Sequence, residues 1–246
     1  MSRRAWVEEV MGTVVSIHVR GPRSEGAPVA SLVGECLADL QWVDEVFSPY
    51  RPGSAVSRLR RGDLTVRQAA AIRPEIAEVI DLCQEATRRT GGAFSWLLPD
   101  DRGRLLIDPT GLVKGWAIAR CVERLETLRG HAYCVNVGGD VAVGGVDGGV
   151  DGDRPWQIGL QDPRDPGRVA EVVAIRQGGV ATSGTTARGA HLIDPSTGAR
   201  PARRGSVSVV GPSILWADVW ATALFVGAPA LADAALAQDA WEVIRL

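Results

Sequence analysis

The chain has 246 residues, of which 46% are hydrophobic and 23% are charged, a balance that is typical of globular proteins and argues against a disordered or fibrous chain. A chain of this length can bury a substantial core, and we expect one domain over residues 1–246, built as a single body or as two closely packed lobes. The formal net charge of −2 gives no indication of a nucleic-acid-binding surface.

The sequence favours a cytoplasmic protein. Two arginines stand near the start, but Glu8 and Glu9 interrupt the apolar run that a secretion signal needs, so we expect no such signal. The longest apolar stretch, residues 214–225, is broken by Asp218, which argues against a membrane span. The four cysteines are far apart and form no C-x-x-C pair, so we expect buried thiols rather than a disulfide frame or a zinc site.

In the first half of the chain, hydrophobic periodicity predicts helices and strands in alternation. Pro74 stands at the expected first position of one helix, which the pair Gly91-Gly92 ends, and Gly130 is expected to end another. The predicted elements are a strand at 10–19, a helix at about 29–46, a loop at 47–54, the helix from Pro74, a short strand and turn at 104–111, and a helix at 113–130.

Hairpins dominate the second half. Residues 133–146 and 154–163 are predicted to form two strands of one hairpin, joined by the Gly- and Asp-rich residues 147–154. This pattern favours an α+β fold over a doubly wound parallel sheet. Short strands are expected at 169–176, 179–183, 191–194 and 206–211, followed by an apolar helix at 214–225, a final helix and a last strand at 241–246.

Within the apolar segment ILWADVWATALF, Asp218 and Thr222 are four residues apart, so on a helix they would lie on one face, one turn apart. The other positions are apolar on all sides, which is typical of a buried helix. A buried carboxylate is costly without a compensating charge or hydrogen bonds, so we expect positive charge against this face. The D-x-x-x-T spacing by itself favours an Asp–Arg pair, while a Mg²⁺ site would use the same oxygen atoms.

Lys114 is the single lysine among 27 basic residues, so the chain uses a compact ammonium group at one place only. It falls in the first turn of the helix predicted after the turn at residues 109–111, where free backbone N–H groups attract anions. No Walker A loop is present. A surface lysine on an ordinary strand–turn–helix is the alternative, but a cation at the positive end of a helix favours an anion site.

Two further segments are rich in glycine. Residues 180–201 combine hydroxyl side chains with His191 and the turn at 195–198, a combination that can bring oxygen ligands and a proton carrier to a substrate. Two β-turns around a short strand would explain the glycines and prolines of this segment but not the histidine. The glycine pairs of VNVGGDVAVGG indicate a tight hairpin or a close backbone approach, and no helix follows them as a dinucleotide fingerprint requires.

Nine segments of the chain, in the order found here, resemble ApbE-type FAD:protein FMN transferases. The resemblance extends from Met11 to Val226, nearly the whole chain, and implies an ApbE-like, two-lobed mixed α/β architecture with a largely antiparallel sheet. The segments are MGT, FSPYRPGSAVSRL, GGAF, IDPTGLVKGWA, NVGGDVAVGG, PWQIGLQDP, ATSG, HLIDPSTGARP and ADVWATALF.

The resemblance implies an activity and a set of site residues. Such proteins bind FAD and Mg²⁺, cleave the diphosphate and attach FMN through a phosphoester to a Thr or Ser of a client flavoprotein with a D-x-x-[ST]-G-A motif, releasing AMP. The implied Mg²⁺ ligands are Asp218, Thr222 and the carbonyl of Gly111. His191, Lys114 and Asp218 are the implied catalytic residues, with His191 as the candidate for proton transfer. The implied FAD contacts are Met11, Tyr50, Ala93, Phe94, Ser95, Asp108, Lys114 and Leu192.

The chain departs from the family pattern at Ser95, where relatives commonly carry Asp. Residues 194–199, DPSTGA, resemble the acceptor motif itself, and we interpret them as a turn of this chain rather than a site of self-flavinylation. Two alternatives to the transferase are an FAD pyrophosphatase that gives FMN and AMP without a client, a choice that Tyr50 and its loop could influence, and a non-catalytic flavin-binding protein.

Overall fold

The computed structural model describes residues 2–100, 102–146, 154–185, 192–199, 201, 203–227 and 230–246. Its main feature is a seven-stranded sheet with the order β1-β2-β5-β6-β9-β10-β11, in which neighbouring strands are antiparallel. The strands are β1 (Ser2–Val10), β2 (Thr13–Gly21), β5 (Ala132–Val137), β6 (Asp140–Gly145), β9 (Gly178–Gly184), β10 (Ser206–Gly211) and β11 (Glu242–Arg245). The predicted α+β class with a largely antiparallel sheet is confirmed, while the division of the chain into domains stays a prediction.

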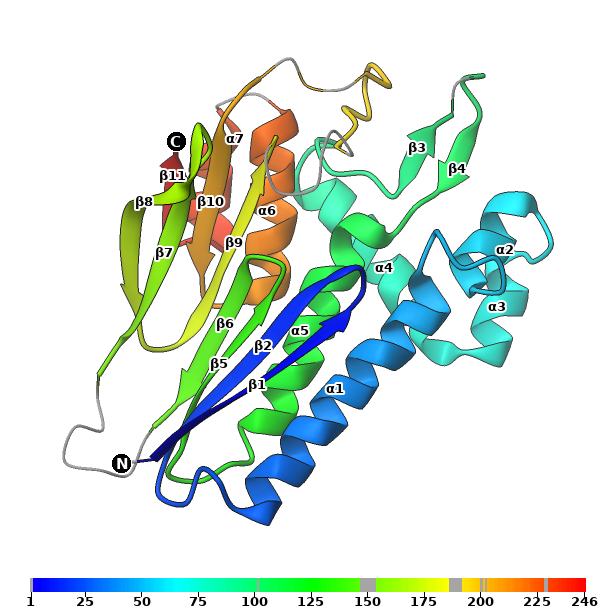
Figure 1. The fold of residues 1–246 in the computed structure, drawn as a ribbon. Coiled ribbons are helices and arrows are strands. Elements are labelled where there is room, and N and C mark those ends of the chain that lie inside the picture. The colour runs from blue at the N-terminus through cyan, green and yellow to red at the C-terminus, as the bar shows by residue number, and fades with distance from the viewer. Residues whose placement is uncertain are drawn as a thin grey trace.

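Helices cover one face of the large sheet (Figure 1). The smaller elements α2, α3, β3 and β4 lie to the right of the sheet in this view. The helices are α1 (Ala27–Phe47), α2 (Ala55–Arg61), α3 (Val66–Ile72), α4 (Pro74–Arg89), α5 (Thr110–Leu125), α6 (Ile214–Val226) and α7 (Leu231–Gln238), and the remaining strands are β3 (Leu97–Pro99), β4 (Leu105–Ile107), β7 (Trp156–Asp162) and β8 (Asp165–Ile175).

The central part of the sheet is buried on both faces, because the β7–β8 hairpin packs over β5, β6, β9, β10 and β11 on the side opposite the helices. Alternate residues of a strand point to opposite faces, and β5 shows the result. Val135 and Val137 join the cluster under the helices, whereas Ala132 and Cys134 join the cluster under β7 and β8. This two-sided burial explains why the segment is apolar almost throughout.

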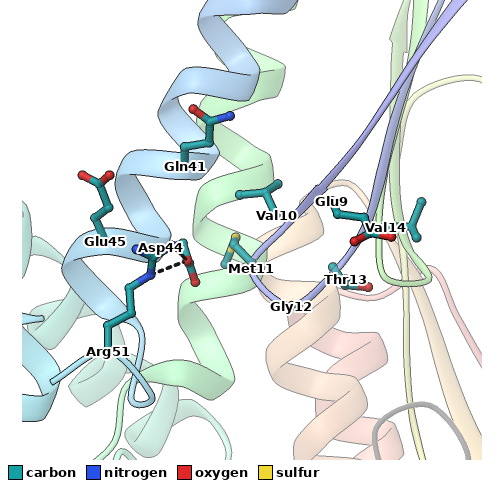
Figure 2. A pocket seen from close by; sticks show the side chains of 10 residues that line it. All are labelled: Glu9, Val10, Met11, Gly12, Thr13, Val14, Gln41, Asp44, Glu45 and Arg51. Atoms are coloured by element: carbon teal, nitrogen blue, oxygen red, sulfur yellow. Dashed lines mark hydrogen bonds and ion pairs between the residues drawn. The ribbon is translucent and has the colours of Figure 1, made fainter.

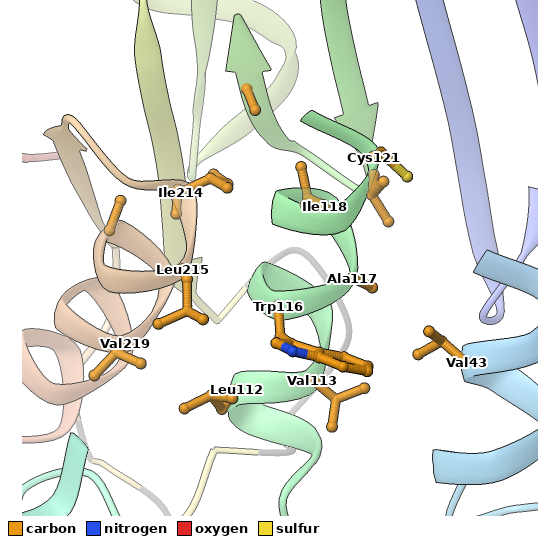
Figure 3. Close-up of a cluster of buried hydrophobic side chains, with 14 of the residues drawn as sticks. Val43, Leu112, Val113, Trp116, Ala117, Ile118, Cys121, Ile214, Leu215 and Val219 are labelled. Carbon is orange, nitrogen blue, oxygen red and sulfur yellow. The ribbon is translucent and has the colours of Figure 1, made fainter. Parts of the chain in front are cut away.

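Helix α5 is the centre of the helical layer. Figure 3 shows it between α1 and α6, with Val43 approaching from α1 and Leu215 and Val219 approaching from α6. Ile118, in the middle of α5, is fully buried. The N-terminal part of α5, in which Lys114 is the fifth residue, is therefore held by packing on two sides as well as by the sheet.

The predicted hairpin between residues 133–146 and 154–163 is wrong. Residues 133–146 already contain a complete hairpin, because Gly138 and Gly139 take positive φ angles of 59° and 98° and turn the chain back between β5 and β6. The β7 strand pairs instead with β8. Positive φ angles at two successive residues do not occur in a continuous strand but are typical of a tight hairpin turn, and glycine adopts them without strain.

Other boundaries also differ from expectation. Strand β1 escaped prediction because it is an edge strand with mostly exposed and charged residues. The short helices α2 and α3 were likewise missed. The helix expected to reach Gly130 ends at Leu125, and the described part of the expected 191–194 strand, residues 192–194, is not in a strand.

The prediction of buried thiols is confirmed for all four cysteines. Burial raises the pKa of the Cys134 thiol to about 12, so this group stays protonated and unreactive at neutral pH. Among the described residues, no three His, Cys, Asp or Glu side chains come together as a metal cluster. No helix in the described ranges is both long and apolar enough to cross a membrane.

Replacement of Ile118 by Ala should lower the free energy of unfolding by about 2–5 kcal/mol, because it leaves a cavity in the centre of the helical layer. Urea denaturation measures the change. The control is Val7→Ala, at a side chain that is 63% exposed, which should change the free energy of unfolding by less than about 0.5 kcal/mol. Equal effects of the two substitutions would contradict the central place of α5.

Candidate functional site

The buried carboxylate of the apolar helix α6 has a positive partner. Asp218 is 3% exposed, and its Oδ1 atom lies 3.7 Å from Nζ of Lys114 on α5. The other carboxylate oxygen, Oδ2, accepts a hydrogen bond of 3.1 Å from the backbone N–H of Gly115. The expectation of positive charge against this face is therefore confirmed, and the cation is the single lysine rather than an arginine.

Gly115 allows α5 and α6 to approach closely enough for these contacts. A Cβ atom at this position would lie 3.0 Å from Cα of Leu215 and 3.1 Å from Cβ of Asp218. Both distances are shorter than ordinary van der Waals contacts between carbon atoms. The glycine that follows the lysine thus allows close packing between the two helices, which a larger residue would strain.

Lys114 has a second carboxylate partner that the sequence analysis missed. Its Nζ atom forms an ion pair with Oδ2 of Asp140, the first residue of β6. Asp140 is 1% exposed, and its Oδ1 atom accepts a hydrogen bond of 3.0 Å from the backbone N–H of Thr182 on β9. In the sequence, only the position of this aspartate directly after two glycines marks it, and that pattern is also common in ordinary hairpins.

The implied metal ligands lie around the same point. Thr222 follows Asp218 by one turn of α6, and its Oγ1 atom is hydrogen-bonded to Oγ of Ser183 at 3.1 Å. In a regular helix the N–H of Gly115 points at the carbonyl of Gly111, and here the same N–H also contacts Asp218. A carboxylate, a hydroxyl and a carbonyl are the kinds of oxygen donor that Mg²⁺ accepts. These residues fit the implied ion.

The turn that leads into α5 is supported by an arginine that the sequence analysis also missed. Asp108 forms an ion pair with Arg60 of α2 through Oδ2, while its Oδ1 atom accepts a hydrogen bond of 3.1 Å from the N–H of Thr110. The ring of Phe94 lies against Gly111, because a Cβ at Gly111 would be 3.2 Å from Cε2 of the phenylalanine. Phe94 and Asp108 are thus both adjacent to the start of α5.

Ser95 and Ala93 occupy the segment between α4 and β3. The Ser95 hydroxyl donates to the carbonyl of Leu97 at 2.9 Å and accepts from the Leu97 N–H at 3.1 Å, so it stabilises a local turn. The methyl group of Ala93 lies beside Gly227, which directly follows α6, at 3.1 Å from the place of a Cβ there. Leu192 packs partly buried against the main core. His191 lies outside the described residues.

Met11 and Tyr50 lie near a groove with a volume of about 610 Å³. Figure 2 shows Met11 in the turn between β1 and β2, facing α1, with a positive φ angle of 56°. Tyr50, next to the groove residue Arg51, is 89% exposed. The groove is lined by Glu9, Val10, Met11, Gly12, Thr13, Val14, Gln41, Asp44, Glu45 and Arg51.

The β1–β2 turn that lines the groove lies at the same end of the sheet as Lys114 and its carboxylate partners. The N–H of Gly138, in the turn before Asp140, donates a hydrogen bond of 3.1 Å to the carbonyl of Val14 in β2. The β1–β2 turn with Met11 and the β5–β6 turn before Asp140 are therefore neighbours. The fold brings Met11, Lys114 and Asp218 to one end of the sheet although they are far apart in the sequence.

A lysine near the start of α5 lies against two buried carboxylates, and this cluster of charges marks one end of the α+β fold as the candidate site of an enzyme. The model of the ApbE family matches residues 11–100 and 95–244. The chain therefore belongs to the ApbE family.

Named relatives and solved structures agree with this assignment. The FAD:protein FMN transferase of Haemophilus influenzae is 31% identical over 159 residues, which are 60% of this chain and 44% of that protein. The Escherichia coli FAD:protein FMN transferase is 33% identical over 159 residues, 60% of this chain and 41% of that protein. The matched region thus spans less than half the length of either relative.

The fold is shared with solved proteins at lower sequence identity. The ApbE protein of Thermotoga maritima superimposes with a TM-score of 0.73 at 24% identity, covering 92% of this chain and 87% of the other. The flavin transferase ApbE of Vibrio cholerae gives a TM-score of 0.70 at 20% identity, covering 99% and 97%. These likenesses confirm the ApbE-like architecture expected from the sequence.

Replacement of Gly115 by Ala should lower the free energy of unfolding by about 1–3 kcal/mol, because the new methyl group would force α5 away from α6. The matched control is Gly34→Ala in α1, where a Cβ would meet nothing within 4 Å. That substitution should raise stability by up to about 1 kcal/mol through helix propensity alone. Thermal and urea unfolding compare the two variants, and a stabilising effect of Gly115→Ala would refute the close packing.

Proposed function

We propose that this protein transfers FMN from FAD to the hydroxyl of a Thr or Ser side chain in a client flavoprotein and releases AMP. The named relatives are FAD:protein FMN transferases, which supports the reaction class. The observation that carries the proposal is the placement of Lys114, the fifth residue of α5, beside the buried carboxylate of Asp218. An ammonium group near a helix N-terminus can pair with the negative oxygens of a diphosphate.

In the proposed reaction the client hydroxyl oxygen bonds to the phosphorus of the FMN half of FAD. The bond from that phosphorus to the bridging oxygen breaks, AMP leaves with this oxygen, and the hydroxyl proton passes to a base. Negative charge grows on the leaving phosphate as this bond breaks. Lys114 would stabilise that charge and hold the diphosphate in line with the incoming hydroxyl.

The family implies a Mg²⁺ ion, and the residues around Asp218 fit it. Asp218, Thr222 and the carbonyl of Gly111 would hold the ion, which when bound supplies further positive charge to the diphosphate oxygens. The family also implies His191 as the proton acceptor. Its imidazole would take the proton from the client hydroxyl, a role that suits its usual pKa.

The remaining residues would position the flavin dinucleotide. Phe94 and Asp108, both next to the start of α5, are proposed to contact FAD together with Ala93, Ser95 and Leu192. Met11 and Tyr50 are proposed to contact it from the β1–β2 turn and the loop after α1. The client would present a D-x-x-[ST]-G-A segment, and a cytoplasmic location stays a prediction.

Replacement of Asp218 by Ala should slow AMP release from FAD in the presence of magnesium by about a hundredfold, because loss of one preorganised charge typically costs about 3 kcal/mol in the barrier. Chromatography of AMP measures the rate. The control is Asp39→Asn on α1. The carboxylate of Asp39 pairs with Arg124 at a distance of 2.7 Å, and neither residue belongs to the site. This control should leave the rate unchanged, and full turnover by Asp218→Ala would rule out the metal assignment.

The same assay separates the transferase from its alternatives. The protein is mixed with FAD and magnesium, with and without a reporter protein that carries a D-x-x-[ST]-G-A segment, and flavin fluorescence of the reporter is followed on a denaturing gel. AMP and a fluorescent reporter that appear together support the transferase. AMP without the reporter indicates an FAD pyrophosphatase, and no AMP at all indicates a flavin-binding protein.

A further inference from the structure

We propose that Asp140 is a positioning residue that holds the ammonium group of Lys114 at the FAD diphosphate site. This inference rests on the proposed function. Asp140 itself would touch neither substrate nor metal, since it would act through Lys114.

The ammonium group of Lys114 lies closer to the carboxylate of Asp140 than to that of Asp218. Its Nζ atom is in direct contact with Oδ2 of Asp140, whereas it lies 3.7 Å from Oδ1 of Asp218. The Asp218 carboxylate has the N–H of Gly115 as a separate partner at 3.1 Å. The geometry thus joins the lysine to β6 more closely than to α6.

Asp140 is itself fixed before any ligand arrives. It follows the tight Gly138-Gly139 turn, in which the N–H of Gly139 donates to the Asn136 side chain at 3.0 Å. Its Oδ1 atom accepts from the N–H of Thr182 on the neighbouring strand at 3.0 Å. Because one carboxylate oxygen is held by the sheet, the other oxygen points at Lys114. The side chain of Lys114 is 20% exposed, whereas that of Asp140 is almost completely buried.

The charges also favour separate roles for the two carboxylates. Asp140 and Asp218 bring two negative charges to a site with one ammonium group. A buried ion pair adds little to stability when compared with apolar packing, so its presence here calls for another reason. With its ammonium group paired to Asp140, Lys114 would stay in place when a metal ion binds beside Asp218.

A purely structural alternative is that Asp140 serves only as the acceptor for the Thr182 N–H. Asparagine can accept that hydrogen bond through its amide oxygen but carries no charge for Lys114. Asp140→Asn therefore separates the two roles within nearly the same volume. The structural alternative expects no effect on FAD binding, while the positioning role expects a loss.

A double-mutant cycle with Asp140→Asn and Lys114→Met tests the proposal, with the dissociation constant for FAD measured by calorimetry at fixed magnesium. Asp140→Asn should weaken FAD binding about tenfold in the wild-type background. In the Lys114→Met background the same substitution should change the dissociation constant less than twofold, because its partner is gone. Equal effects in both backgrounds, or no effect in the wild-type background, would overturn the positioning role.

The control variant is Ser208→Ala, which removes the hydroxyl partner of the Thr182 side chain at 2.7 Å and leaves Asp140 and Lys114 intact. It should bind FAD as the wild-type protein does. Failure of the wild-type protein to bind FAD or release AMP would refute the proposed function. Normal FAD binding by Asp140→Asn beside an active wild type would refute only the role of Asp140.

Because Lys114 is the only lysine, the wild-type protein offers a second measurement that does not depend on folding of a variant. Growth with ¹⁵N-labelled lysine gives a single side-chain ammonium signal in nuclear magnetic resonance. A slowly exchanging signal that magnesium alone moves little is expected for a lysine held by Asp140. A rapidly exchanging, solvent-like signal, or one that magnesium displaces strongly, would contradict the proposal.

Discussion

The close contact between α5 and α6 at Gly115 is the constraint on which the site depends. With no side chain at this position, the backbone of α5 comes near enough for its N–H to reach the carboxylate of Asp218 at 3.1 Å. That contact, together with Lys114, compensates a carboxylate in a helix that is otherwise apolar on every side. A buried carboxylate is costly unless such partners compensate it, so the close approach of the two helices stabilises Asp218 in its buried position.

The rest of the fold keeps this contact in place. The helical layer packs α5 between α1 and α6, as Figure 3 shows, and the large sheet supports the layer from one side. The β7–β8 hairpin covers the other face of the central strands, so these strands cannot shift register without exposing apolar residues. Tight turns at one end of the sheet then place Met11 and Asp140 near the start of α5.

The three charged side chains of the site therefore lie on three separate elements of the fold. Asp218 is carried by α6, Lys114 by α5 and Asp140 by β6, and each is held by packing or by a backbone hydrogen bond. Charges fixed in this way need little rearrangement when a ligand binds, which is the property that makes preorganised sites effective. The open groove beside Met11, by contrast, is lined by exposed charged residues on a turn and on α1.

The sequence by itself determined the fold class, most helices, the burial of the cysteines and the importance of Lys114 and Asp218, because local periodicity, composition and one isolated charge in an apolar helix are visible along the chain. It misjudged β1 and the pairing of β5, β6, β7 and β8, because strand partners are chosen by contacts between distant residues. Arg60 and Asp140 were likewise found only in the tertiary structure. An aspartate after two glycines looks like any hairpin residue until the folded chain places a lysine against it, since an ion pair depends on distance in space and not on separation in sequence.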